Sequence, residues 1–141
     1  MILPDINLLV YAYNRDAPAH AGARAWWEGL LGSNEPVGIP WAVSCGFIRL
    51  MTHPAVLMTP LDPKRAVAHV HSWLERANVE VLDPGPRHLD LLGRLLGSLR
   101  VAGNLTTDAH LAALAIEHQC ELHSNDGDFG RFSGLRWRNP L

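Results

Sequence analysis

The sequence lacks the features that mark a membrane protein, a disulfide-rich protein or a disordered one. Its two cysteines, Cys45 and Cys120, lie far apart and form no C-x-x-C pair, which excludes a zinc ribbon and a thioredoxin-type motif. No apolar run approaches the ~18 residues that a membrane-spanning helix needs. Hydrophobic residues make up 48% of the chain and charged residues 18%, so most of it is expected to fold around a hydrophobic core.

Positive charge is also scarce. The formal net charge is −2, the pI is about 6.4, and Lys64 is the only lysine among 12 basic residues. A protein that binds nucleic acid through bulk positive charge alone has a pI above ~9, so this class is excluded. The early Asp5 and the lack of a basic N-terminal segment argue against a signal peptide, and the expected location is the cytoplasm.

The length predicts a single domain over residues 1–141, because domains commonly contain ~100–200 residues. A short strand is expected at the start of segment 2–10, followed at once by a turn or helix. Further strands are expected in segments 35–40, 79–82, 121–125 and 135–138. Helical character occurs in segments 16–31, 41–51, 62–74, 86–99 and 109–118. This alternation predicts an α/β fold with a central, mostly parallel sheet of four to five strands flanked by helices.

Acidic side chains occur at three separate places in this pattern. Asp5 interrupts the first apolar segment, Asp108 precedes a very apolar helix and is expected to cap it, and Asp126 and Asp128 follow the fourth strand. In a parallel sheet, ligands bind beyond the carboxyl ends of the strands. Each acid alone has a simpler interpretation as a helix cap. Three segments that bring acids to the same edge favour a joint site.

A group of carboxylates calls for a cation, because like charges at close range repel each other. Hard cations such as Mg²⁺ prefer oxygen ligands and keep several of their waters, and such a water can attack a phosphodiester bond. Histidine offers a weaker alternative: no H-E-x-x-H motif occurs, and His69 and His71 are too close in sequence to share a helix face. The sequence does not decide whether His110 faces the solvent or the cleft.

The segments that carry the acids resemble one protein family. They are M-I-L-P-D-I-N at residues 1–7, N-L-T-T-D-A-H at 104–110 and S-N-D-G-D-F at 124–129. In order and spacing they are similar to PIN domains, especially the VapC toxins of type II toxin–antitoxin pairs, over nearly the whole chain. The resemblance implies a PIN-like fold and a Mg²⁺-dependent endoribonuclease, with Mn²⁺ as a substitute ion. It also implies a homodimer without membrane contact, and a VapB-type antitoxin that blocks the site and alone contacts DNA.

The resemblance also implies roles, residue by residue. Asp5, Asp108 and Asp126 match metal ligands, and Asp128 matches a supporting acid of the catalytic set. The polar neighbours expected to hold these acids or orient a water are Asn7, Asn104 and Thr107.

Basic and aromatic residues offer RNA contacts that the sequence leaves open. Arg15 and Arg131 are candidates for contacts with RNA phosphates, and a solvated surface position explains each of them equally well. The five tryptophans lie mostly on apolar faces, so packing in the core or a dimer interface is the default. Base stacking is the lesser alternative.

One departure from the family pattern supports a different function. Many PIN domains carry a glutamate in the helix after the second strand, where Gly46 aligns, and residues 37–61 contain no acid. This gap keeps a catalytically weak or inactive PIN domain that binds RNA or protein as an alternative to the nuclease. A phosphohydrolase with Asp5 as nucleophile is a third alternative, but it would need an acid in place of Asn7 and a lysine late in the chain.

Overall fold

In the part of the chain that the structure describes, five short strands form one parallel sheet at the centre of the fold. The computed structural model describes residues 1–99, 103 and 105–141. The strands are β1 (Ile2–Pro4), β2 (Val37–Ile39), β3 (Val79–Val81), β4 (Glu121–His123) and β5 (Trp137–Arg138), in the spatial order β3-β2-β1-β4-β5. All neighbouring strands run parallel, with Leu3 of β1 opposite Leu122 of β4. The predicted α/β fold with a parallel sheet is confirmed.

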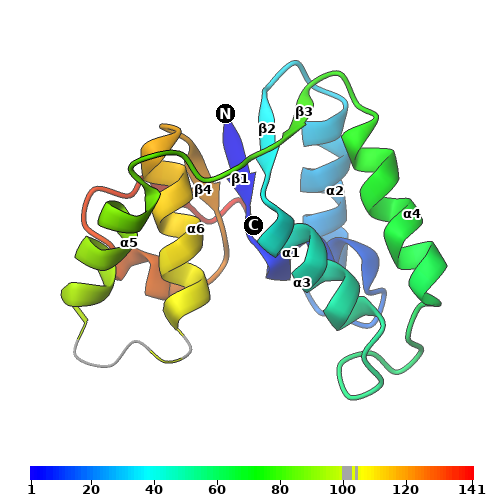
Figure 1. Cartoon of the computed structure of the whole chain (residues 1–141). Helices are drawn as coiled ribbons and strands as arrows, with labels where there is room; N and C mark the ends of the chain where they lie inside the picture. The colour runs from blue at the N-terminus through cyan, green and yellow to red at the C-terminus, as the bar shows by residue number, and fades with distance from the viewer. Residues whose placement is uncertain (100–102, 104) are drawn as a thin grey trace.

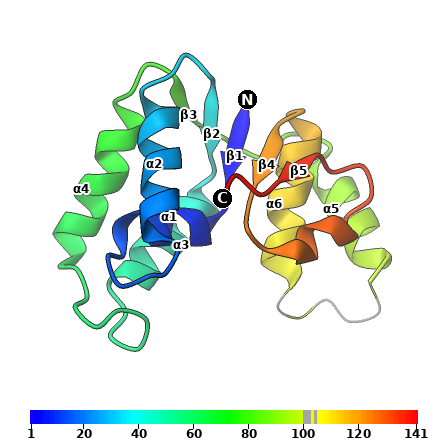
Figure 2. The same cartoon turned by 180° about the vertical axis from the view of Figure 1, so that it is seen from behind.

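Within the described residues, six α-helices and one 3-10 helix surround this sheet. They are α1 (Ile6–Tyr13), α2 (His20–Leu31), α3 (Trp41–Met51), α4 (Pro63–Leu74), α5 (His88–Gly97), α6 (Leu105–Glu117) and the 3-10 helix η1 (Gly127–Arg131). Figures 1 and 2 show α5 and α6 together on one side of the strands and α1 to α4 on the other. Within the described residues, no helix is both long and apolar enough to cross a membrane.

The first strand is only three residues long, and a helix follows it at once. The Asp5 side chain accepts a hydrogen bond from the Ile6 backbone N–H at 2.7 Å and so caps α1. The apolar residues that extend the segment beyond Ile6 are buried by helix packing: α1 lies against both α2 and α3. Their helical spacing, rather than β-alternation, decides the structure of this segment.

The helix that carries Asp108 begins earlier than expected. We expected Thr106 to Asp108 to cap a helix from Ala109, whereas α6 already begins at Leu105. Asp108 therefore lies in the first turn of α6, where an acidic side chain interacts favourably with the positive end of the helix dipole. The expectation of a cap at Asp108 was wrong, and its placement at the N-terminal end of the helix was right.

Two tryptophans form the centre of the core on the α1–α4 side. Trp27 and Trp73 are almost completely buried, with ring centroids 5.5 Å apart in an edge-to-face arrangement. Phe47 packs on Trp73 with ring centroids 4.7 Å apart. Their burial confirms the default interpretation of these two tryptophans as core residues. Burying one such side chain stabilises a fold by roughly 1.5–3 kcal/mol. Trp41, by contrast, is 53% exposed.

Candidate catalytic site

The predicted acids lie at the carboxyl ends of two neighbouring parallel strands. Asp5 directly follows β1, and Asp126 follows β4 after two intervening residues. The Asp5 backbone N–H donates to the carbonyl of His123 at 2.9 Å, which ties the end of β1 to the end of β4. The parallel pairing therefore places acids that are far apart in sequence at one edge of the sheet.

Asp5 is a buried carboxylate with both oxygens engaged. Its side chain is 4% exposed. One oxygen accepts the Ile6 N–H, and the other accepts the hydroxyl of Ser124 at 2.8 Å. Burial raises the pKa of Asp5, the bonds from Ser124 and Ile6 oppose that rise, and the charge of Asp126 adds to it. These contacts fix the orientation of the carboxylate.

Ser124 links two of the acids. It is fully buried, and its hydroxyl oxygen both donates to Asp5 and accepts the backbone N–H of Asp126 at 2.9 Å. Asp126 in turn accepts the backbone N–H of Asp128 at 2.9 Å. Sequence reasoning assigned no role to Ser124. The available signal was its position two residues before an aspartate, a spacing that favours a local turn closed by the hydroxyl.

Asp108 provides electrostatic evidence that the four acids share one site. It lies half-buried in the first turn of α6. Burial raises its pKa first, and the negative charges of Asp5, Asp126 and Asp128 raise it further, to about 6. Side chains from two other segments of the chain thus act on the Asp108 carboxyl group. We call Asp5, Asp108, Asp126 and Asp128 the carboxylate cluster.

Asp128 lies at the outer edge of the carboxylate cluster. Its carboxylate forms an ion pair with Arg131 at 3.2 Å, three residues further along η1, and both side chains are substantially exposed. Exposed pairs of this kind contribute little to stability, ~0–1 kcal/mol. The contact shows that Arg131 lies beside the acids.

The chemistry of these donors suits a hard cation. The cluster offers only carboxylate oxygens, and the raised pKa values of Asp5 and Asp108 show that burial and mutual repulsion penalise their charged forms. A bound cation would relieve that repulsion. Within the described residues, no three His, Cys, Asp or Glu side chains form a ready-made metal-binding group. Mg²⁺ fits such an open arrangement, because it usually keeps several waters and takes one or two carboxylates.

Apolar packing surrounds Gly46, the position predicted from the sequence to align with the family glutamate. A Cβ atom added to Gly46 on α3 would lie 2.6 Å from Cδ1 and 3.1 Å from Cγ1 of Ile6 on α1. Ile6 directly follows Asp5 and occupies the space that a side chain at position 46 would need. A side chain at position 46 would therefore require the Ile6 side chain to shift.

The other predicted polar residues are less closely tied to the cluster. Asn7 and Thr107 are exposed, on α1 and in the first turn of α6, and their side chains make no hydrogen bond within the described residues. Asn104 lies outside the described residues. His110 bonds to His88 of α5, with 2.8 Å between the ring nitrogens.

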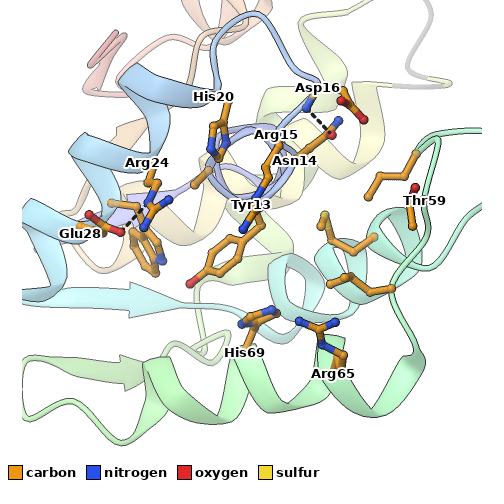
Figure 3. Close-up of a pocket in the computed structure, with 15 residues that line it drawn as sticks. Tyr13, Asn14, Arg15, Asp16, His20, Arg24, Glu28, Thr59, Arg65 and His69 are labelled. Carbon is orange, nitrogen blue, oxygen red and sulfur yellow. Dashed lines mark hydrogen bonds and ion pairs between the residues drawn. The ribbon is translucent and has the colours of Figure 1, made fainter.

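Arg15 lies apart from the acids, beyond the C-terminal end of α1. It lines a pocket of about 610 Å³ between α1, α2, the segment after α3, and α4 (Figure 3). None of the four clustered acids lines this pocket. Two of its residues on α4, Arg65 and His69, were given no binding role from the sequence.

Comparison with known proteins matches this chain to one family and to several curated relatives. Residues 2–135 match the PIN domain. Ribonuclease VapC33 from Mycobacterium tuberculosis (strain ATCC 25618 / H37Rv) is 45% identical over 141 residues, covering 100% of this chain and 99% of the relative. Ribonuclease VapC37 from the same strain is 39% identical over 140 residues, covering 99% of this chain and 97% of the relative.

Solved structures share the fold at low sequence identity. The structure of VapBC2 from Rickettsia felis, bound to a DNA fragment from its promoter, superposes with a TM-score of 0.69 at 19% identity, covering 99% of this chain and 98% of that chain. The structure of Mycobacterium tuberculosis VapC20, described as a toxin that cleaves the sarcin–ricin loop, gives 0.63 at 19% identity, covering 96% and 99%. These structures support the arrangement of strands and helices described above.

Proposed function

The chain belongs to the PIN-domain family and, within it, to the VapC ribonucleases, and from this premise we propose that it is a metal-dependent endoribonuclease acting as the toxin of a VapBC pair. The observation that carries the proposal is the convergence of three other acids on Asp108, whose pKa is raised to about 6 by burial and by their like charge. An apolar or neutral binding surface would have no need of such mutually repelling groups.

In this proposal, Asp5, Asp108 and Asp126 hold one Mg²⁺, with Asp128 as a supporting acid; Mn²⁺ is a substitute. A bound Mg²⁺ would supply an activated water and offset charge on the phosphoryl oxygens. Ser124 holds Asp5 and Asp126 at a fixed separation through its two hydrogen bonds. Asn7 and Thr107 are proposed to orient solvent at the exposed rim, and Arg131 to contact RNA phosphate beside the acids.

The proposed setting follows the family pattern. We propose that residues 1–141 form one PIN domain that acts in the cytoplasm on RNA, pairs with a second copy of itself, and is inhibited by a VapB-type antitoxin. The solved VapBC2 neighbour is a toxin–antitoxin assembly on promoter DNA, which supports such a partner. DNA would be contacted only through the antitoxin.

The test is cleavage of RNA by the purified protein with added Mg²⁺ or Mn²⁺. We expect cuts at discrete positions in structured host RNA, no cuts in EDTA, and a loss of at least ~100-fold in Asp5→Asn and Asp108→Asn. This estimate follows because even outer-shell partners of a metal commonly cost 10–100-fold. Asp90→Asn, at an exposed acid in the first turn of α5, is the matched control and should cut normally.

Two outcomes would contradict the proposal. Cleavage that persists in EDTA, or that survives both substitutions, would remove the metal and the cluster from the reaction. RNA binding without cleavage by the unaltered protein would instead support the inactive binding module, an alternative that its similarity to named ribonucleases does not favour.

A further inference from the structure

The pocket beyond the C-terminal end of α1 is separate from the carboxylate cluster but connected to it by one helix. Its volume is about 610 Å³, within the ~300–1,000 Å³ of small-molecule sites. Asp5 caps the start of α1 and Asn14 caps its end. At 1.5 Å rise per residue, these two caps lie about 14 Å apart, a distance that a few extended nucleotides can bridge.

The pocket is richer in positive charge than the chain as a whole. Three arginines and two acids line it, whereas the chain carries a net charge of −2. Arg24 is paired with Glu28 at 2.7 Å on α2. Arg15 and Arg65 have no carboxylate oxygen within 4.0 Å in the part of the chain that the structure describes. Asp16, an acid at the same rim, likewise forms no ion pair among the described residues. Arg15 and Arg65 are therefore free to pair with an anion.

Aromatic rings form one wall of the pocket. The Tyr13 ring packs against the His69 ring with centroids 4.5 Å apart, and Figure 3 shows Arg65 next to His69 on α4. Burial, followed by the nearby charge of Arg65, lowers the pKa of His69, so its imidazole is neutral at neutral pH. The Tyr13 hydroxyl accepts the indole N–H of Trp73 at 2.8 Å, which holds the phenol ring in place. Such a wall suits a planar ring.

Trp27 adds a hydrogen-bond donor that lacks a partner. It lines the pocket and is 1% exposed, and its indole Nε1 has no acceptor among the described residues. Buried donors are almost always hydrogen-bonded, so an unpartnered one calls for an explanation. An acceptor atom on a molecule bound in this pocket would satisfy it once the side chains that cover the indole nitrogen shift aside.

We propose that this pocket binds one nucleotide of the RNA substrate, with its base beside Tyr13 and His69, an acceptor atom on Trp27 Nε1, and its phosphate between Arg15 and Arg65. This inference rests on the proposed endoribonuclease function and adds to it a second contact point that positions the strand. A carboxylate side chain of a protein partner would use the arginines but would leave the ring faces and most of the volume unfilled. The mixture of cations, rings and a buried donor favours a nucleotide.

The test measures RNA binding in EDTA, where the proposed cleavage cannot occur. The probe is a fluorescent, single-stranded oligoribonucleotide of eight nucleotides and random sequence. We expect Arg15→Ala/Arg65→Ala to weaken binding at least ~10-fold and to lower the slope of log K against log salt by about 0.7, the contribution of one phosphate contact on a single strand. Arg76→Ala, at an exposed arginine beyond the other end of α4, is the matched control.

A second variant tests the base contact. Trp27→Phe keeps an aromatic ring but removes the indole N–H. We expect weaker binding of the same probe with an unchanged salt slope, because no charge is lost. Tm measurements verify that the variant is folded.

The proposal is overturned if Arg15→Ala/Arg65→Ala and Arg76→Ala bind the probe with the same affinity and salt slope. It is also overturned if the double variant keeps its RNA affinity but escapes inhibition by a co-expressed antitoxin, which would assign the pocket to a protein partner. Because binding is measured without metal, the two proposals fail separately. Pocket-dependent binding without cleavage in Mg²⁺ contradicts only the nuclease function.

Discussion

The two ends of helix α1 carry opposite charge and differ in how their side chains are held. At the N-terminal end, Asp5 is buried and bonded through both carboxylate oxygens. Beyond the C-terminal end, Arg15 is exposed, and no carboxylate of the described residues pairs with it. The helix dipole favours an anion at the first end and a cation at the second. A net charge of −2 therefore says little about where RNA can approach.

The two ends also differ in what their charges cost. Around Asp5 the negative charges of several acids repel one another, and together with burial this repulsion raises the pKa of Asp108 to about 6. In the pocket, the arginines lie at the rim and keep contact with water. Charge is therefore unfavourable at the acidic end, where burial and repulsion raise the pKa of Asp108, and is tolerated at the basic end, where water solvates the arginines. Four predictions test this contrast, in order of decreasing effect.

The largest effect concerns the hydroxyl that links Asp5 and Asp126. We expect Ser124→Ala to lower the cleavage rate ~10–100-fold, the usual result of losing a group that orients metal ligands. Ser124→Thr keeps the hydroxyl and should retain most of the activity. The control is Ser33→Ala, which removes a hydroxyl that bonds only locally, to Leu30. Equal rates in Ser124→Ala and the unaltered protein would show that the acids hold their positions without this link.

The next prediction concerns the missing glutamate. Gly46→Glu should lower the free energy of unfolding by ~1–3 kcal/mol, since its side chain would have to displace Ile6 and overpacking costs about that much. Urea denaturation measures the loss, and Ile6→Ala in the same chain should recover part of it. A Gly46→Glu protein that is as stable as the unaltered one and binds Mg²⁺ more tightly would show that packing against Ile6 does not disfavour an acid at this position.

A smaller effect concerns the repulsion between the acids. The folded-state pKa of Asp108 is raised to about 6 from an ordinary value of 3.8, so between these pH values the folded protein keeps a proton that the unfolded chain releases. Stability should therefore fall as the pH rises from about 4 to about 6. Asp108→Asn removes this loss, so its Tm in EDTA should exceed that of the unaltered protein at pH 7.5 and approach it near pH 4.

Mg²⁺ provides the complementary measurement for this variant. Added at pH 7.5, it should raise the Tm of the unaltered protein more than that of Asp108→Asn, because it relieves the repulsion that the variant has already lost. Asp90→Asn should respond as the unaltered protein does. A variant that is less stable than the unaltered protein at pH 7.5 in EDTA would contradict the assigned repulsion.

The smallest effect concerns the arginine at the acidic end. Arg131→Ala removes an exposed ion pair with Asp128, so the free energy of unfolding should change by less than ~1 kcal/mol. Because Asp128 partly neutralises the charge of Arg131, Arg131→Ala should also weaken RNA binding less than Arg15→Ala does. The fluorescent oligoribonucleotide assay compares the two, and a larger loss in Arg131→Ala would reverse the contrast between the two ends of α1.

Much of the fold could be predicted because local chemistry specifies it. Helix α3 spans the expected residues 41–51, and Asp62 caps α4 by accepting the Lys64 N–H at 2.8 Å. The alternation of strands and helices leads to a parallel sheet by general packing rules. The gathering of the acids also follows, because parallel neighbours must end at the same edge.

The remaining features depend on contacts between segments far apart in sequence. The link from Ser124 to Asp5 spans 119 positions, and the contact between Ile6 and Gly46 joins two helices whose facing surfaces no local pattern reveals. The same holds for the pocket, which takes Arg15 from the end of α1 and Arg65 from α4.

The sequence by itself determined the order of elements, the family and the identity of the four acids, because periodicity, capping and motif spacing are properties of neighbouring residues. Only the tertiary structure decided which oxygen of Asp5 is bonded to Ser124, which side chain lies against position 46, and where a cationic pocket lies relative to the cluster. Those features arise when side chains from separate helices and strands compete for the same volume, and such competition exists only in the folded chain.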